Sequence, residues 1–181
     1  MMDAPMMKKT YMARYASPLG EMMMASDGVA LTGLWFCGQK YFAATLPEER
    51  IEKVDLPIFV KVRRWLDIYF SGKEPDFTPP LAPDGTAFRQ QVWRKLREIP
   101  YGATTTYGAI ARSVAAENGT AAMSAQAVGG AVGHNPISII VPCHRVMGAD
   151  GSLTGYAGGI ERKLALLKIE GQSLSSKSIK S

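Results

Sequence analysis

A cluster of prolines near the middle of the chain places the strongest limit on how its 181 residues can fold. Four prolines fall within nine residues: Pro75, Pro79, Pro80 and Pro83. Because proline fixes φ and lacks a backbone N–H, this density excludes a helix or a central strand. We therefore expect a linker, with one domain at residues 1–83, a second at 84–171 and a polar, disordered tail at 172–181.

The first domain combines short β-type runs with one amphipathic helix. Turn signals predict strands at the following ranges: 11–15, 21–26 and 29–35. A helix is expected at residues 57–71, with Pro57 near its start and Gly72 just past its end. No catalytic constellation is visible in this half. We expect it to act as a scaffold, with Cys37 as a structural residue.

The second domain is mostly helical, so the predicted fold class is α/β (α+β). Helices are expected at these ranges: 86–98, 107–116, 125–132 and 160–170. The pair at 107–116 and 125–132, separated by Asn118-Gly119, has the outline of a helix-turn-helix. In such a motif the second helix enters a DNA groove.

That second helix is unusually poor in side chains that could read bases. Gln126 is its only polar residue, among alanines, valine and Gly129-Gly130. Small residues would allow a close backbone approach to DNA without sequence preference. Tight packing against a neighbouring helix is the competing interpretation.

The segment Val141–Val146 places a thiol beside an imidazole. The apolar run at 137–141 predicts a buried strand that ends at Pro142, so Cys143 would lie at the edge of the core. Successive side chains of an extended segment point to opposite faces, so a water bridge between Cys143 and His144 is easier than a direct bond. An inert buried cysteine beside a structural histidine is the alternative.

Two features follow this segment. Residues 148–159 contain five glycines and predict a compact loop able to grip a planar polar ligand. Glu170 sits in the last turn of a helix, where the macrodipole disfavours an acid by up to about 1 kcal/mol. Such a broken rule is expected near a functional site, although a surface pairing with Lys168 or an arginine would also explain it.

Composition excludes several classes of protein. The chain is 46% hydrophobic and 20% charged, and no apolar run reaches membrane-spanning length. Residues 1–10 lack the apolar core of a signal peptide. Two distant cysteines form no disulfide framework, and with two histidines at no metal-binding spacing they predict no metal site. We expect a cytoplasmic protein. Its net charge of +5 lies in the second half and tail, as in a polyanion-binding domain or an ordinary basic surface.

Three motifs together resemble the methylated-DNA–protein-cysteine methyltransferases, also called O6-alkylguanine DNA alkyltransferases. They are Pro142-Cys143-His144-Arg145-Val146, Gly155-Tyr156-Ala157-Gly158-Gly159 and Leu166-Leu167-Lys168-Ile169-Glu170-Gly171. The resemblance covers about residues 86–171 strongly, and the first half only in outline. It implies repair of double-stranded alkylated DNA by a monomer without a cofactor, with irreversible transfer of the alkyl group to Cys143 after base flipping.

The resemblance also assigns roles to individual residues. His144 would act on Cys143 through water, Glu170 would hold His144, and Asn135 would brace the active-site turn. Substrate would be bound by Tyr107, Val146, Tyr156, Ala157 and Gly158. The expected DNA contacts are Gln126, Ala127, Gly129, Gly130 and Arg145.

The sequence departs from the family pattern at one position, and two functions other than alkyl transfer are to be compared with it. The family commonly has an arginine that fills the gap left by the flipped base, and Gln126 stands at the aligned position after a longer segment, 115–123. We expect Gln126 to intercalate, with weaker binding than an arginine would give. The rivals are a DNA-binding module with an inert Cys143, and a Cys-His hydrolase that forms an acyl-enzyme.

Overall fold

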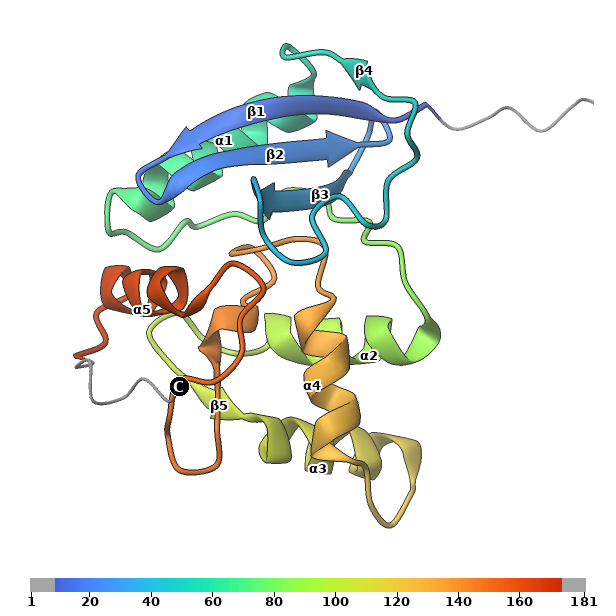
Figure 1. The fold of residues 1–181 in the computed structure, drawn as a ribbon, viewed down its shortest axis with the longest axis vertical. Coiled ribbons are helices and arrows are strands. Elements are labelled where there is room, and N and C mark those ends of the chain that lie inside the picture. Colours follow the sequence, from blue (N-terminus) through green and yellow to red (C-terminus); the bar gives the residue numbers. More distant parts are fainter. Residues whose placement is uncertain (1–8, 174–181) are drawn as a thin grey trace, which may run out of the picture.

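The N-terminal half is a sheet backed by one helix. The computed structural model describes residues 9–173 (Figure 1). The sheet has the order β3-β2-β1-β4, in which β1, β2 and β3 are antiparallel neighbours and the short β4 runs parallel to β1. The strands are β1 (Tyr11–Ser17), β2 (Gly20–Ser26), β3 (Leu31–Phe36) and β4 (Ile51–Glu52). Three of these strands were predicted, and β4 was not.

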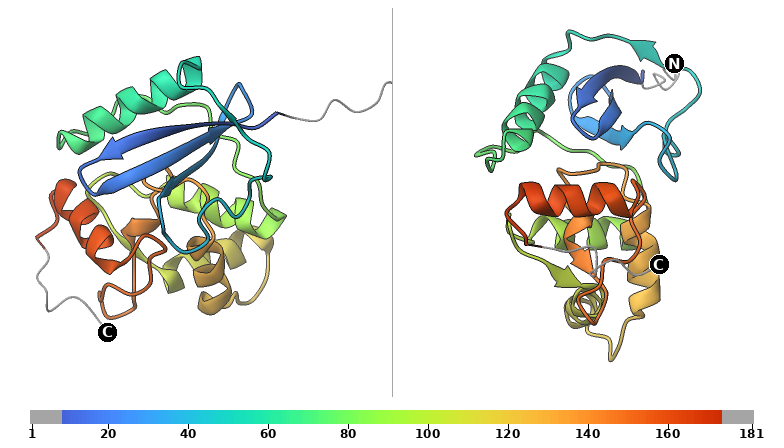
Figure 2. Two further views of the ribbon diagram at one scale, coloured as in Figure 1. Left: turned by 45° about the horizontal axis from the view of Figure 1, so that its top comes forward. Right: turned by 60° about the vertical axis from the view of Figure 1, so that its left-hand side comes forward.

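Helix α1 (Pro57–Phe70) covers one face of this sheet (Figure 2). The methionine run in β2 shows how both faces are filled. Met22 and Met24 join the main core, whereas Met23 packs with Trp35 and Ala25 in a separate cluster. A strand buried on both faces needs no polar alternation, which is why the pattern of β2 is blurred in the sequence.

The C-terminal half consists of helices around a small parallel ladder. Its helices are α2 (Ala87–Arg97), α3 (Tyr107–Asn118), α4 (Ala125–Gly133) and α5 (Ile160–Ile169). Thr86, Thr106 and Ser124 cap helices α2, α3 and α4, because the side chain of each accepts a hydrogen bond from the backbone N–H three residues later. Strands β5 (Thr105–Thr106) and β6 (Val146–Met147) pair in parallel. The mixed α/β fold class and the helix–break–helix of α3 and α4 are confirmed.

The predicted strand at residues 137–141 is wrong. Only Ile137 forms a bridge, to Leu34 of β3, and the chain then turns through Ile139 at a φ of 71°. The segment is nevertheless buried. The side chain of Asn135 satisfies its main-chain groups by accepting from Ile137 N (3.0 Å) and donating to Val141 O (2.9 Å). A buried coil with its own polar brace gives the same apolar sequence signal as a strand.

The two halves share one hydrophobic core. Residues of β2, β3 and α1 belong to the same cluster as residues of α2, α3 and α4. The proline-rich linker is also held, since Leu31 N donates to Pro80 O and Ala82 N donates to Leu31 O, each at 2.8 Å. The predicted division at residue 83 therefore separates two layers of one packed structure.

Two expectations fall wholly or partly outside the described residues. The tail was expected at 172–181, and the structure describes only its first two positions. The expectation that residues 1–10 form no signal peptide is also affected, because residues 1–8 lie outside the described part. Between residues 9 and 173, none of the helices is long and apolar enough to cross a membrane.

Candidate active site

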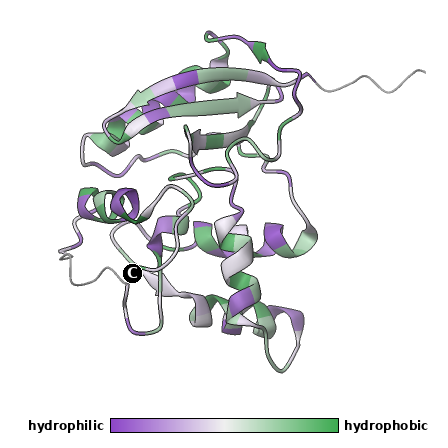
Figure 3. Ribbon diagram, in the orientation of Figure 1, coloured by the Kyte–Doolittle hydropathy of each residue, from purple (hydrophilic) through white to green (hydrophobic). Residues whose placement is uncertain are grey.

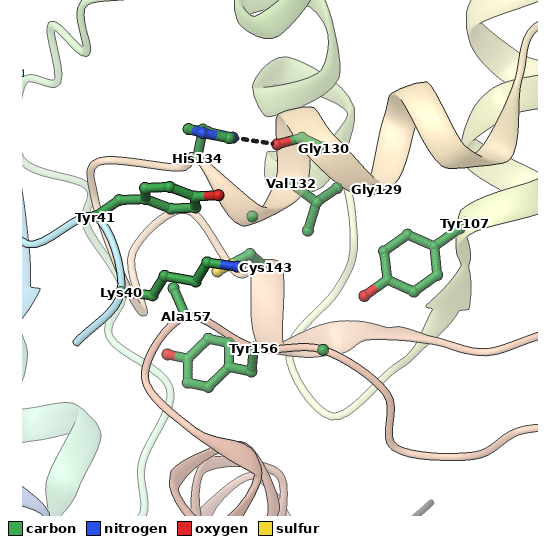
Figure 4. Close-up of a pocket in the computed structure, with 12 residues that line it drawn as sticks. Lys40, Tyr41, Tyr107, Gly129, Gly130, Val132, His134, Cys143, Tyr156 and Ala157 are labelled. Carbon is green, nitrogen blue, oxygen red and sulfur yellow. Dashed lines mark hydrogen bonds between the residues drawn. The ribbon is translucent and has the colours of Figure 1, made fainter. Parts of the chain in front are cut away.

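Cys143 lines a pocket built from both halves of the chain (Figure 4). The cavity has a volume of about 360 Å³, within the usual range for small-ligand sites. The C-terminal half contributes Tyr107, Gly129, Gly130, Gly155, Tyr156 and Ala157. Lys40 and Tyr41 of the N-terminal half close the opposite side, next to His134. The thiol is reached through a pocket of mostly small and aromatic residues.

A short 3₁₀ turn, η1 (Cys143–Arg145), separates the side chain of Cys143 from those of His144 and Arg145. Cys143 faces the pocket, while His144 and Arg145 both bond Glu170 at the end of α5. The expected separation of the Cys143 and His144 side chains therefore holds, but it arises from a turn and not from the alternation of a strand.

Glu170 is the centre of a buried network. Its Oε2 atom accepts from Tyr69 at 2.6 Å and lies 2.5 Å from Nε2 of His144, and its Oε1 atom accepts from Nε of Arg145 at 2.7 Å. Arg145 also donates to the carbonyl of Ile99 at 2.7 Å. The Glu170 and His144 side chains are fully buried. The alternative of an exposed Glu170 paired on the surface is thus excluded.

The network fixes the charge states of its members. Burial alone would raise the pKa of the Glu170 carboxyl, but hydrogen bonds from His144, Arg145 and Tyr69 outweigh burial and lower the pKa to about 2. Burial lowers the pKa of His144, although Glu170 opposes this change. Since Arg145 neutralises the carboxylate, we assign a neutral His144 that donates from Nε2. Its Nδ1 atom is then an acceptor, with no hydrogen-bond partner within residues 9–173.

Burial favours the protonated form of the Cys143 thiol. Burial raises the pKa of Cys143, while the amide of Asn135 and the positive charge of Lys163 act in the opposite direction. A reaction that needs the thiolate must therefore move a proton off Sγ as the substrate binds.

Lys163 of α5 is a buried cation that supports the pocket from behind. Its Nζ atom donates to three carbonyls: Val146 (2.6 Å), Thr154 (3.0 Å) and Gly155 (3.2 Å). Burial lowers its pKa to about 8. These bonds tie the glycine-rich loop to β6, so the predicted compact loop has a fixed shape.

Most of the chain matches one known family in two parts. Residues 9–83 match the profile described as 6-O-methylguanine DNA methyltransferase, ribonuclease-like domain. Residues 87–172 match 6-O-methylguanine DNA methyltransferase, DNA binding domain. The methylated-DNA–protein-cysteine methyltransferase of Haemophilus influenzae is 45% identical over 166 residues, which are 91% of this chain and 88% of that protein. This chain belongs to the 6-O-methylguanine DNA methyltransferase family.

Solved structures agree with this membership. The crystal structure of Mycobacterium tuberculosis OGT in complex with DNA is 42% identical, with a TM-score of 0.76, covering 88% of this chain and 92% of that one. The M. tuberculosis O6-methylguanine methyltransferase gives a TM-score of 0.77 at 40% identity, over 92% and 96% of the two chains. The resemblance drawn from three motifs is confirmed, and it extends to the N-terminal half.

The helix-turn-helix of this family member presents an open surface. Gln126 and Ala127 are exposed on α4, whereas Val128 is fully buried against the core. A Cβ atom added to Gly130 would meet nothing within 4 Å, so packing does not require glycine there. Parts of α4 are pale in Figure 3, which reflects the intermediate hydropathy of its glycines. The tight-packing interpretation therefore fails for the outward face of α4.

Three predicted site residues are not among the residues that line the pocket. The Arg145 side chain points into the Glu170 network, where it compensates the charge of the buried carboxylate, so its predicted contact with DNA stays a prediction. Val146 is fully buried, and its carbonyl already accepts from Lys163. Gly158 lies behind Tyr156, where a Cβ atom would come within 2.7 Å of the ring. Val146 and Gly158 therefore support the pocket from outside its surface.

Residues of the site that were missed in the sequence include Lys40, Tyr41, Tyr69, His134 and Lys163. Only Lys163 left a local signal, since it precedes Leu167 and Glu170 by four and seven residues on one helix face. A lysine on a buried stripe predicts a partner inside the fold. Between residues 9 and 173 no group of side chains could hold a metal ion.

Proposed function

We propose that this protein repairs double-stranded DNA by moving the alkyl group from O6 of an alkylated guanine to Sγ of Cys143. Each molecule would act once, because the thioether formed has no easy leaving group. No cofactor is required, since the protein is itself the acceptor, and O4-methylthymine is a second candidate substrate. The observation that supports this proposal most directly is the position of Cys143 in a pocket bordered by the open surface of α4.

The transfer is an in-line displacement at the alkyl carbon. The Cys143 thiolate forms a new S–C bond as the O6–C bond breaks, and guanine leaves with the electron pair of that bond. The proton lost by the thiol is matched by the proton that the departing guanine takes up. Thiol and O6-alkylguanine are thus converted to thioether and guanine, without an oxidant or a second substrate.

His144 is suited to remove the thiol proton. Its Nδ1 atom has a free lone pair, because Nε2 is committed to Glu170. We propose that a water molecule joins Nδ1 to Sγ and that Glu170 stabilises the imidazolium formed during the reaction. Arg145 and Tyr69 hold Glu170 in place for this role. Asn135 acts by bracing the turn that carries Cys143.

The base must leave the DNA stack to reach this thiol. We propose that α4 enters the groove, that Gly129 and Gly130 allow the backbone to approach, and that Gln126 fills the gap left by the base. Tyr107 would exchange its bond to Thr154 O (3.1 Å) for a bond to the guanine ring. Its pKa, raised by burial to about 12, keeps its hydroxyl protonated and able to donate. Tyr156 and Ala157 would contact the base.

Two further proposals complete this function. The reaction requires a reduced thiol, which favours a reducing compartment such as the cytoplasm. A monomer suffices, because every residue of the proposed mechanism comes from one chain.

Replacement of Cys143 by alanine separates this function from its rivals. Cys143→Ala should lose all transfer from a methylated duplex and keep its DNA affinity, since the thiol lies within the pocket and away from the exposed face of α4. Wild-type protein that binds the duplex but gains no methyl group would favour the inert DNA-binding module. Repeated turnover through a labile acyl-enzyme would favour the hydrolase.

A further inference from the structure

The segment between β3 and β4 carries N-terminal side chains to the acceptor pocket. Lys40 and Tyr41 line the pocket together with Cys143, and Lys40 N donates to Ala157 O at 3.1 Å. The preceding residue, Gln39, is buried, and its Oε1 atom accepts from Phe36 N (2.9 Å) and Ser138 Oγ (3.4 Å). Contacts with both halves of the protein therefore fix this segment at the pocket.

Tyr41 is held in a strained conformation against the end of α4. Its φ is 59°, in the left-handed region that costs a non-glycine residue about 1–2 kcal/mol. Its ring stacks on His134 with centroids 3.9 Å apart and planes 24° apart. His134 in turn bonds Gly130 O through Nδ1 at 2.7 Å, as Figure 4 shows. The stack links the N-terminal segment to the helix expected to enter DNA.

Lys40 supplies positive charge where α4 alone would supply negative charge. The C-terminal end of a helix carries the negative end of its macrodipole, and this end of α4 borders the pocket at Gly133 and His134. Within residues 9–173, the pocket lining contains no carboxylate and Lys40 has no ion-pair partner. Its ammonium lies 5.2 Å from the Tyr41 ring centroid, at the exposed rim.

We propose that Lys40 binds a backbone phosphate next to the flipped nucleotide, with Tyr41 as the positioning residue that holds Lys40 beside α4. The N-terminal half then forms part of the DNA-binding site, which extends beyond the helix-turn-helix. A lysine ammonium is a suitable point charge for a phosphate oxygen. This inference rests on the proposed function, because it requires DNA at the pocket mouth.

The dependence of DNA affinity on salt tests the phosphate contact. Binding of a duplex with one O6-methylguanine would be measured over a salt series, in a Cys143→Ala background that prevents transfer. Lys40→Gln should reduce the slope of log K against log salt by about 0.9 and weaken binding about fivefold near physiological salt. Lys40→Arg should restore most of both quantities. Lys61→Gln removes the same charge from an exposed site on α1 and should change neither.

A second measurement separates a phosphate contact from a role inside the pocket. With Cys143 intact, Lys40→Gln should slow transfer from a methylated duplex at limiting protein concentration, yet leave transfer from free O6-methylguanine base unchanged. An unaltered salt slope, or an equal loss on the duplex and the free base, would overturn the assignment of Lys40. Failure of the proposed function would look different, because wild-type Cys143 would then remain unmethylated in both assays.

Discussion

The two sides of Cys143 are built from opposite kinds of residue. Behind the thiol lie four buried residues: Glu170, which bonds His144 and Arg145, and Lys163, which donates to three backbone carbonyls. In front of the thiol lie glycines, alanine and aromatic rings around an open pocket. The rear side contributes to stability and to the charge state of the histidine, whereas the front side admits a substrate. Substitutions on the two sides should therefore fail in different ways.

The largest effect is expected at the rear, for Glu170→Gln. Removing one member of a buried ion pair leaves Arg145 without its counter-charge, which costs about 3–5 kcal/mol in the free energy of unfolding at pH 7. Transfer should also slow, because His144 loses the carboxylate that stabilises its charged form. Urea unfolding and single-turnover kinetics would measure the two losses.

Glu170→Gln should also remove part of the pH dependence of the free energy of unfolding. A carboxyl whose pKa falls from 4.5 to about 2 on folding contributes stability above pH 4.5, and this contribution disappears as the pH falls toward 2. For Glu170 it amounts to about 3 kcal/mol. The stability gap between wild type and Glu170→Gln should therefore narrow as the pH falls from 5 to 3. A gap that stays constant would show that Glu170 is not held as a carboxylate.

Tyr69→Phe should have the next largest effect on stability. The ring of Tyr69 is fully buried, and its hydroxyl donates to Glu170 at 2.6 Å. Loss of a hydrogen bond to a charged group costs about 1.5–3 kcal/mol, and phenylalanine fills the same space. Tyr101→Phe is the matched control, because its hydroxyl lies 3.4 Å from the carbonyl of Ile169 at a partly exposed site. Equal losses of stability in the two variants would show that the Tyr69 hydroxyl does not stabilise the Glu170 network.

On the front side, Tyr107→Phe should impair transfer more than stability. The hydroxyl is proposed to donate to guanine, and loss of one such bond to developing charge slows the reaction roughly ten- to a hundredfold. Stability should change by less than about 1 kcal/mol, the value of the bond to Thr154 O. Single-turnover rates on a methylated duplex, with unmethylated DNA affinity as control, would measure this. A stability loss as large as that of Glu170→Gln would break the contrast between the two sides.

The smallest effect is expected for Gln126→Ala. Gln126 is exposed on α4, so its removal should leave stability unchanged and weaken binding of methylated DNA a few-fold, the equivalent of about 1 kcal/mol. Gln126→Arg should tighten binding by adding the charge that the family commonly has. If both variants bind and repair like wild type, Gln126 has no intercalating role.

Local features of the fold could be predicted from the sequence. The caps at Thr86 and Ser124 and the break at Gly119 depend on neighbouring residues, and the helices begin and end close to the predicted positions. The run at 137–141 could not be interpreted in this way. Its apolar residues predict a strand because they are buried. The observed turn depends on a positive φ at Ile139 and on the hydrogen bonds from the Asn135 side chain, which the sequence does not show.

The same division applies to the site. Cys143, His144 and Glu170 belong to short motifs, so the resemblance identified them. The contact between Tyr69 and Glu170 spans 101 residues. The sequence does not predict it, because Tyr69 fits the apolar stripe of an ordinary amphipathic helix. The ion pair of Arg145 with Glu170 was not predicted, because a sequence cannot show which way a charged side chain points. Lys40 and Tyr41 reach the pocket only through the packing of the two halves.

Intact-protein mass spectrometry after incubation with a duplex containing O6-methylguanine, followed by peptide mapping, tests the central claim most directly. The account predicts the gain of a single methyl group on Cys143, saturating at one equivalent per protein molecule. An unchanged mass with DNA binding intact would contradict alkyl transfer, and a methyl group on any other residue would contradict the assignment of Cys143 as the acceptor.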